Sequence, residues 1–218
     1  KAASGVSVED VGESQFEDIT LDDYSVIYLC NLYRIPDRAQ AAAPEEASGE
    51  EEADPETEVE ATPAESGDPL QSISRLEELE RWVRKGGGLV IALGDQSDPL
   101  IFNREMYRNG EGLSPVRLEE ERGDPEEETW SHFKVEQDHP VMRQFKDEVF
   151  SNYVKIFRWW HTTIAEDDLA GGKVNVVTRL TNTDVSPAVV EKQYGAGRVI
   201  VFTTPLDYDW SDWPSDRW

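Results

Sequence analysis

The sequence contains one cysteine and three histidines in 218 residues. Because Cys30 is the single cysteine, a disulfide within the chain is excluded. A structural zinc site needs a cluster of Cys and His ligands, and the sequence contains no such cluster. His132, His139 and His161 show no i, i+4 pair of the kind that shares a metal on one helix face. The sequence therefore predicts neither a disulfide nor a metal site.

Long apolar runs and basic residues are also scarce. The longest nearly apolar runs, 26–30, 86–94 and 199–202, are far shorter than the roughly 20 residues that cross a bilayer as a helix. Lys and Arg number 21 against 46 Asp and Glu, which gives a formal net charge of −25. This charge repels a phosphate backbone, and no basic stripe offsets it. We therefore expect a soluble segment that does not bind nucleic acid.

Residues 39–68 differ in composition from the rest of the chain. They contain eleven acidic residues and no Lys, Arg or aromatic residue. Such a stretch repels itself and has little to bury, so it is interpreted as a disordered acidic insertion; a tail that binds a basic partner is the alternative. Around it, we expect residues 1–218 to form a single α/β domain. Because the chain begins at Lys1, we also expect it to be a fragment of a longer one.

The segments on either side of the insertion predict a βαβ unit. Residues 24–30 form a β-branched and aromatic run typical of a buried strand, and 69–85 have helical spacing of apolar residues, with Asp68 as the expected N-cap. Gly86 to Gly88 can end this helix, and 89–93 read as the next strand. The right-handed crossover rule makes the two strands parallel neighbours in one sheet.

Strands dominate the last third of the sequence. Tyr194-Gly-Ala-Gly197 joins the final two expected strands as a hairpin, which predicts a mixed edge for the sheet. Val6, Val8 and Val11 suggest a further short strand near the start. The strands expected in the last third cover residues 153–163, 174–180, 188–193 and 198–203.

Polar residues follow the strands of the βαβ unit, where open α/β sheets bind their ligands. Asn31 follows the first strand, and Asp95 and Gln96 follow the second. Hydrolases place a Ser or Cys nucleophile at such a turn, but Asp95 is a poor acyl acceptor and Ser97 lacks the flanking glycines of the GxSxG motif. Cys30 ends an apolar run and is interpreted as an inert core thiol.

Three carboxylates lie within six residues at Asp207, Asp209 and Asp212. They could offer oxygen ligands to Ca²⁺ or Mg²⁺. The interpretation that we favour is that Trp210 and Trp213 cap the sheet while their acidic neighbours face water. The glycine turns precede strands rather than open helices, so no phosphate loop and no cofactor are predicted. Recognition of a sugar or protein by aromatic residues is a further alternative, carried by Trp159, Trp160, Trp210, Trp213 and Trp218.

Several motifs resemble the class I glutamine amidotransferase-like superfamily, specifically an uncharacterised, non-catalytic branch of it. The resemblance covers most of the chain outside 39–68. The motifs that carry it are Tyr24-Ser-Val-Ile-Tyr-Leu-Cys-Asn31, Leu79-Glu-Arg-Trp-Val-Arg-Lys-Gly-Gly-Gly-Leu-Val90, Gly94-Asp95-Gln96, Asn103-Arg-Glu-Met-Tyr107, Gly110-Glu-Gly-Leu113, Asp138-His-Pro140, Tyr194-Gly-Ala-Gly-Arg-Val199 and Asp209-Trp-Ser-Asp-Trp-Pro214.

The resemblance implies a fold and a setting. The implied fold is an α/β, flavodoxin-like three-layer sandwich with a mostly parallel sheet and a C-terminal β-hairpin. Domains of this branch occur in bacterial membrane proteins beside an aerotolerance-type N-terminal region and a von Willebrand factor A domain. The implied location is therefore the bacterial cell envelope, with membrane contact only through segments outside this chain.

The resemblance also implies which residues an active enzyme would need. Amidotransferases have a Cys where this sequence has Asp95, and a His with a carboxylate partner where it has Thr203-Thr-Pro205. We therefore expect a non-catalytic binding or scaffolding domain whose partners are proteins or other domains of the same chain. The alternative is a hydrolase or cation-dependent enzyme with its site around Asp95. No catalytic residue is assigned, and the candidate ligand pocket comprises Asn31, Asp95, Gln96, Asp207 and Asp209.

Overall fold

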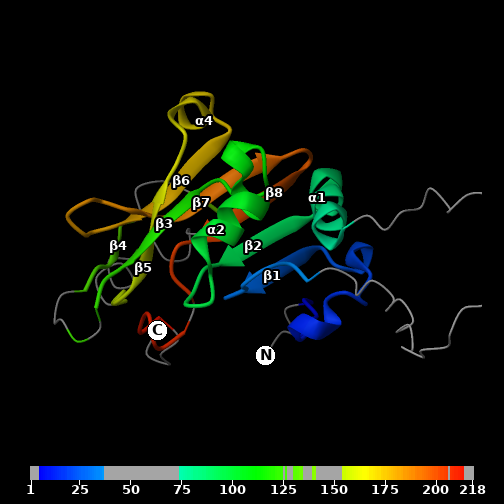
Figure 1. The fold of residues 1–218 in the computed structure, drawn as a ribbon, viewed down its shortest axis with the longest axis horizontal. Helices are drawn as coiled ribbons and strands as arrows, with labels where there is room; N and C mark the ends of the chain where they lie inside the picture. Colours follow the sequence, from blue (N-terminus) through cyan, green and yellow to red (C-terminus); the bar gives the residue numbers. More distant parts are fainter. Residues whose placement is uncertain are drawn as a thin grey trace, which may run out of the picture.

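The computed structural model describes residues 5–36, 74–124, 126, 130–134, 139–140, 154–205 and 207–213. Figure 1 shows a main sheet of strands in the order β1 (Val26–Cys30), β2 (Gly88–Ala92), β8 (Gly197–Phe202), β7 (Pro187–Tyr194), β6 (Val174–Leu180) and β4 (Phe133–Lys134). A smaller sheet pairs β3 (Arg117–Arg122) with β5 (Trp159–Thr163). The predicted acidic insertion at 39–68 lies outside the described residues.

The helical elements are short apart from α1 (Arg75–Lys85). Helix α2 (Pro99–Phe102) continues into the π-helical turn η3 (Asn103–Tyr107) and the 3-10 turn η4 (Arg108–Gly110). The other elements are η1 (Glu13–Gln15), η2 (Leu21–Asp23) and α4 (Glu166–Ala170).

The βαβ unit is confirmed, because β1 and β2 pair in parallel on either side of α1. The cap of α1 differs from the prediction. Ser74 is the N-cap and forms a capping box, in which its Oγ accepts from the Glu77 N–H at 3.3 Å and the Glu77 carboxylate accepts from the Ser74 N–H at 3.1 Å. Asp68 lies outside the described residues. Gly86, at φ 128°, ends the helix as expected.

The prediction of a flavodoxin-like three-layer sandwich with a mostly parallel sheet is wrong. β1, β2 and β8 are parallel, but the pairings β8–β7, β7–β6 and β6–β4 are all antiparallel. The hairpin between β7 and β8 is present, with Tyr194 opposite Gly197. The turns from β6 to β7 and from β7 to β8 return the chain antiparallel without a crossover helix.

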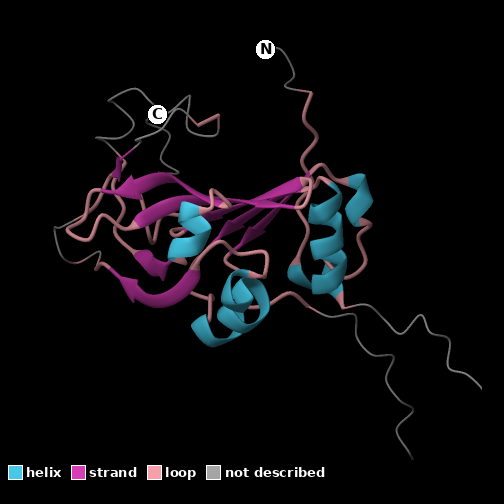
Figure 2. Ribbon diagram, turned by 90° about the horizontal axis from the view of Figure 1, so that it is seen from above, coloured by secondary structure: helices cyan, strands magenta, loops and turns pink. Residues whose placement is uncertain are grey.

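Helical cover is found on one face of the sheet only, within the described part of the chain (Figure 2). The buried side chains of α1, α2 and η3 share one core cluster with Leu29, Ile91 and Val201 of the sheet. The cluster on the opposite face includes Val90, Val189 and Phe202, and no residue of a described helix joins it. The architecture is therefore a mixed α/β sheet with its described helices on one side.

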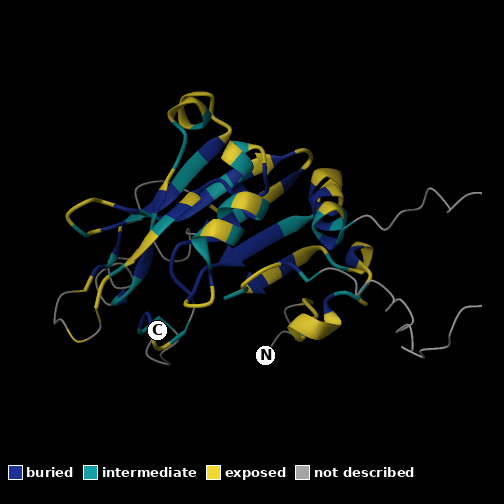
Figure 3. Cartoon of the chain, in the orientation of Figure 1, coloured by how far each residue is buried: buried dark blue, intermediate teal, exposed yellow. Residues whose placement is uncertain are grey.

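The β1 edge of the main sheet and the segment before it carry exposed residues (Figure 3). Val26 and Tyr28 of β1 are 46% and 62% exposed, although Val90, the partner of Tyr28 in β2, is buried. The strand predicted from Val6, Val8 and Val11 is wrong. Residues 5–12 form no strand, and Val6 and Val8 are 73% and 87% exposed, because β-branched residues without a pairing strand gain nothing from an extended conformation.

Candidate functional site

The structure brings three of the predicted site residues together at the carboxyl ends of β1 and β2. Asn31 adopts the left-handed conformation, with φ 51°, directly after β1. Its Nδ2 donates to Asp95 Oδ1 at 2.6 Å, and its Oδ1 accepts from the Gln96 backbone N–H at 2.9 Å. The side chain of Asn31 therefore joins the two neighbouring strand ends. A Cβ atom on Gly94 would lie 2.3 Å from Asn31 Oδ1, so this junction requires glycine there.

Buried polar contacts hold the turn that carries Asp95. Gly94 donates its N–H to Ser97 Oγ at 3.2 Å, and its carbonyl accepts from Trp160 Nε1 at 3.0 Å. Ser97 is buried and its hydroxyl holds the turn, whereas Asp95 and Gln96 are exposed. The role of Trp160 had no signal in the sequence, where it reads only as a strand residue.

A largely apolar hollow lies beside this turn. The hollow is small and partly open to solvent. Its charged and hydroxyl side chains are those of Tyr33, Arg34, Ser97 and Glu105. No sequence pattern indicates this hollow, because its walls come from three separate segments. The main apolar residues that line it are Leu29, Leu32, Ile35, Ile91, Leu93, Ile101, Phe102 and Met106.

Asp207 and Asp209 lie in the turn that follows β8. Asp207 Oδ1 accepts from the backbone N–H groups of Asp209 at 3.2 Å and Trp210 at 3.1 Å, so this carboxylate closes its own turn. Asp209 is exposed. Across the described residues, no group of three or more His, Cys, Asp or Glu side chains could hold a metal ion. Hydrogen bonds therefore connect Asn31 with Asp95 and Gln96, and Asp207 with its own turn.

Most of the tryptophans suggested for recognition are buried in the core. Trp159, Trp160 and Trp210 are buried, and Trp213 is half-buried. Trp218 lies outside the described residues. Trp210 packs beside Trp160 with ring centroids 6.5 Å apart. Large aromatic rings in such positions stabilise the fold but cannot contact a partner.

The histidines contact backbone, hydroxyl and carboxylate groups. His132 Nδ1 contacts the Val154 carbonyl at 2.8 Å, and the His132 backbone N–H donates to Thr181 Oγ1 at 2.9 Å. His139 Nε2 lies 3.1 Å from Glu191 Oε2. His161 lies on β5.

Cys30 is exposed at the end of β1, which contradicts its interpretation as a core thiol. Partial burial of the sulfur raises the pKa of Cys30, and the Asp10 carboxylate raises it further. Alkylation by iodoacetamide at neutral pH should therefore be slower than that of glutathione, and its pH–rate profile should be displaced to higher pH. Asp10→Asn should move the profile part of the way back, whereas Asp167→Asn on α4 should not. Reaction as fast as glutathione at neutral pH would contradict this expectation.

Comparisons with known proteins give only distant matches. No protein-family model matches the sequence, and no curated protein matches it. Two cytoplasmic proteins from Salmonella typhimurium align with 65% of this chain at TM-scores of 0.47 and 0.46 and identities of 15% and 19%. This chain covers 54% of each of them, about half their length. A β-galactosidase from Bacillus circulans sp. alkalophilus aligns with 60% of this chain at TM-score 0.40 and 13% identity, over 18% of the enzyme.

These similarities assign no activity. Among the described residues, no helix is both long enough and apolar enough to cross a bilayer.

Proposed function

We propose that this chain is a non-catalytic binding or scaffolding domain of a larger bacterial membrane-associated protein. The observation that carries the proposal is the state of the turn after β2. Asp95 occupies the position of a nucleophile and is bound to the Asn31 side-chain amide, while the Ser97 hydroxyl is bound within the turn. The resemblance of the sequence motifs to an uncharacterised branch of the amidotransferase-like superfamily is the ground for proposing a setting beside other domains in the cell envelope.

The alternative, a hydrolase or cation-dependent enzyme around Asp95, has less support. General acid–base or nucleophilic catalysis needs a second group within hydrogen-bond reach of the first. The partner of Asp95 is the amide of Asn31, which does not titrate. Of the other acidic residues of the predicted pocket, Asp207 accepts hydrogen bonds within its own turn, and Asp209 is exposed.

The hollow beside the turn supports a binding function. Sites that accept a partner's side chain are concave and mostly apolar, with a few polar groups that fix orientation. The hollow has this character, with Arg34 and Glu105 of opposite charge among its lining residues. We propose that it receives an apolar side chain of a protein partner while the exposed Asp95 and Gln96 contact the partner's polar groups.

Two measurements on the purified chain test this proposal. The first is hydrolysis of L-glutamine and p-nitrophenyl acetate, with and without Mg²⁺ or Ca²⁺, by the wild type, Asp95→Ala and the control Asp167→Ala. We expect no turnover above background in any of them. Turnover that is lost in Asp95→Ala and kept in Asp167→Ala would establish the enzyme instead.

The second measurement is a thermal shift with N-acetyl-leucinamide as the probe for the hollow. Because a ligand bound to the native state stabilises it, the probe should raise the melting temperature of the wild type with increasing concentration. The variant Leu32→Trp, which narrows the hollow, should respond less. An equal response of the two proteins, or none, would contradict the proposed contact site.

A further inference from the structure

We propose that the free edge of β1 binds an extended, basic segment of a protein partner as an added β-strand. This inference rests on the proposed binding function and names the class of partner that it serves. Four features carry it: the backbone groups at the edge, the lack of protection of the strand, the charge around it and the adjacent hollow.

The backbone of β1 presents unpaired groups on its outer side. The Ser25 carbonyl accepts from the Gly88 N–H at 3.1 Å, and the Asn31 N–H donates to the Ala92 carbonyl at 2.8 Å. Since successive residues of a strand direct their backbone groups to alternate sides, the odd-numbered residues of β1 bond to β2. The N–H and C=O groups of Val26, Tyr28 and Cys30 therefore point away from the sheet. No described residue forms a hydrogen bond with them.

This edge lacks the sequence features, such as proline, charge or a bulge, that usually prevent another strand from pairing with an edge strand. Its sequence is Val-Ile-Tyr-Leu-Cys, with no proline and no charge, and it pairs with β2 in unbroken register, without a bulge. Val26 and Tyr28 expose 46% and 62% of their surface beside it. The opposite edge of the main sheet is β4, which has only two residues, and a short edge strand offers little to a partner.

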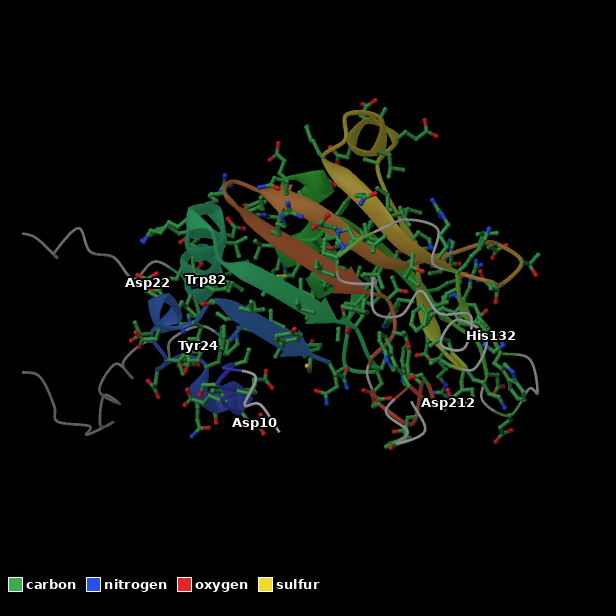
Figure 4. All side chains as sticks on the ribbon, turned by 180° about the vertical axis from the view of Figure 1, so that it is seen from behind. Asp10, Asp22, Tyr24, Trp82, His132 and Asp212 are labelled. Carbon is green, nitrogen blue, oxygen red and sulfur yellow. The ribbon has the colours of Figure 1, made fainter. Side chains whose placement is uncertain are left out.

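The surroundings of β1 are acidic. Residues 5–33 contain seven acidic residues and no Lys or Arg. Figure 4 shows Asp10 on the side of β1 away from β2, and Asp22 and Tyr24 near the start of β1. Glu9 accepts a hydrogen bond from the Tyr24 hydroxyl at 2.5 Å, which holds this acidic segment beside the start of β1. Charge complementarity therefore favours a basic occupant, and two copies that each carry −25 would repel one another.

The hollow continues this surface on the helical side of the sheet. Leu29 of β1 and residues 32–35 line it, so a strand added to β1 would pass its mouth. Side chains of an added strand alternate between the two faces. A segment that alternates basic and apolar residues would thus place apolar groups at the hollow and keep its positive charges within reach of the acidic residues. Main-chain bonds would supply affinity, and these two contacts would supply specificity.

The experiment uses a defined probe, an end-blocked peptide of about nine residues that alternates Lys and Val. Binding is measured by fluorescence anisotropy, and amide hydrogen exchange is measured residue by residue by NMR. The matched peptide control has the same charge but carries N-methyl groups on alternate residues, which removes main-chain donors. The protein variant Tyr28→Lys adds a positive charge at the edge, and Leu169→Lys adds the same charge on the exposed surface of α4, at the other end of the molecule.

The expected result is an alternating pattern of protection. The peptide should slow exchange at Val26, Tyr28 and Cys30 about tenfold or more and leave Ile27 and Leu29, which already bond to β2, almost unchanged. N-methylation should weaken binding about tenfold, and Tyr28→Lys about fivefold, whereas Leu169→Lys should have little effect.

Three results would overturn the inference. One is equal binding of the N-methylated peptide, and another is binding without the alternating protection. The third is protection of the same amides by the protein alone, rising with concentration as dimers form, which would make a second copy the occupant. If the peptide fails while N-acetyl-leucinamide still binds the hollow, the edge inference fails and the proposed binding function stands.

Discussion

Replacement of Trp210 by alanine is expected to lower the free energy of unfolding by about 3–5 kcal/mol. The Trp210 side chain is 2% exposed and packs beside Trp160 in the core cluster under the helices. Its backbone carbonyl accepts from the Phe157 N–H at 2.7 Å, and this bond survives the substitution, so the loss isolates the indole. Because Trp160 also donates to the Gly94 carbonyl, we expect the turn that carries Asp95 to loosen as well.

Urea denaturation followed by circular dichroism measures this change. For a chain of this length the same loss corresponds to a fall of about 6–20 °C in melting temperature. Asp209→Ala, one residue away and exposed, is the control and should stay within about 0.5 kcal/mol of the wild type. If Trp210→Ala stays equally close, the indole does not support the core.

Local patterns predicted the first half of the fold well. The apolar run before Cys30, the helical spacing before Lys85 and the glycines at 86–88 are sufficient for a βαβ unit, because each depends on neighbours in the sequence. The meeting of Asn31 with Asp95 then follows from geometry, since parallel strands end at the same edge. The sequence predicts that the two side chains lie close together, but it does not predict the hydrogen bond between them.

These local patterns did not predict the order of the strands in the sheet. Pairing in a sheet depends on contacts between distant segments, so the periodicity of 174–202 could not show that β6 and β7 run antiparallel on the far side of β8. β3 reads Arg-Leu-Glu-Glu-Glu-Arg, and Leu118 is its one buried residue, so it had no alternating signal. The hollow was missed for a related reason, because residues from 29 to 106 converge there only after folding.

The side-chain type of a residue indicated its role less well than its position in the fold did. The three residues Asp95, Asp207 and Asp209 share one side-chain type, yet Asp95 bonds to Asn31 and Asp207 bonds to its own turn.

Lys192 on β7 is buried although its side chain is charged, and the alternation of residues along the strand does not explain this burial. Its ammonium donates to the carbonyls of Gly110 and Gly112 at 2.6 Å each, and burial lowers its pKa. These carbonyls come from a turn that the sequence does not place beside β7.

Arg75→Ala is expected to cost about 3–5 kcal/mol of the free energy of unfolding, even though it replaces a residue in the first turn of a helix. The Arg75 side chain is 2% exposed, and its Nη2 donates to the carbonyls of Phe16 and Ile19 at 2.7 Å each. Its guanidinium carbon lies 4.9 Å from the centroid of the Phe16 ring. Substitution removes a charged donor from both carbonyls and the packing over the ring, which together hold residues 13–21 against α1.

We expect Arg75→Ala to affect peptide binding at β1, because residues 13–21 lie in the acidic segment that precedes this strand. Amide exchange in this segment should accelerate more than exchange in β7 and β8, and the alternating Lys-Val peptide should bind β1 less tightly as the acidic residues lose their fixed positions. Arg75→Lys should recover part of the stability, since one ammonium cannot reproduce the fork that reaches two carbonyls. Arg81→Ala, at an exposed position on the same helix, is the control. Equal stability losses in Arg75→Ala and Arg81→Ala would contradict this role for Arg75 and leave the acidic segment held by other contacts.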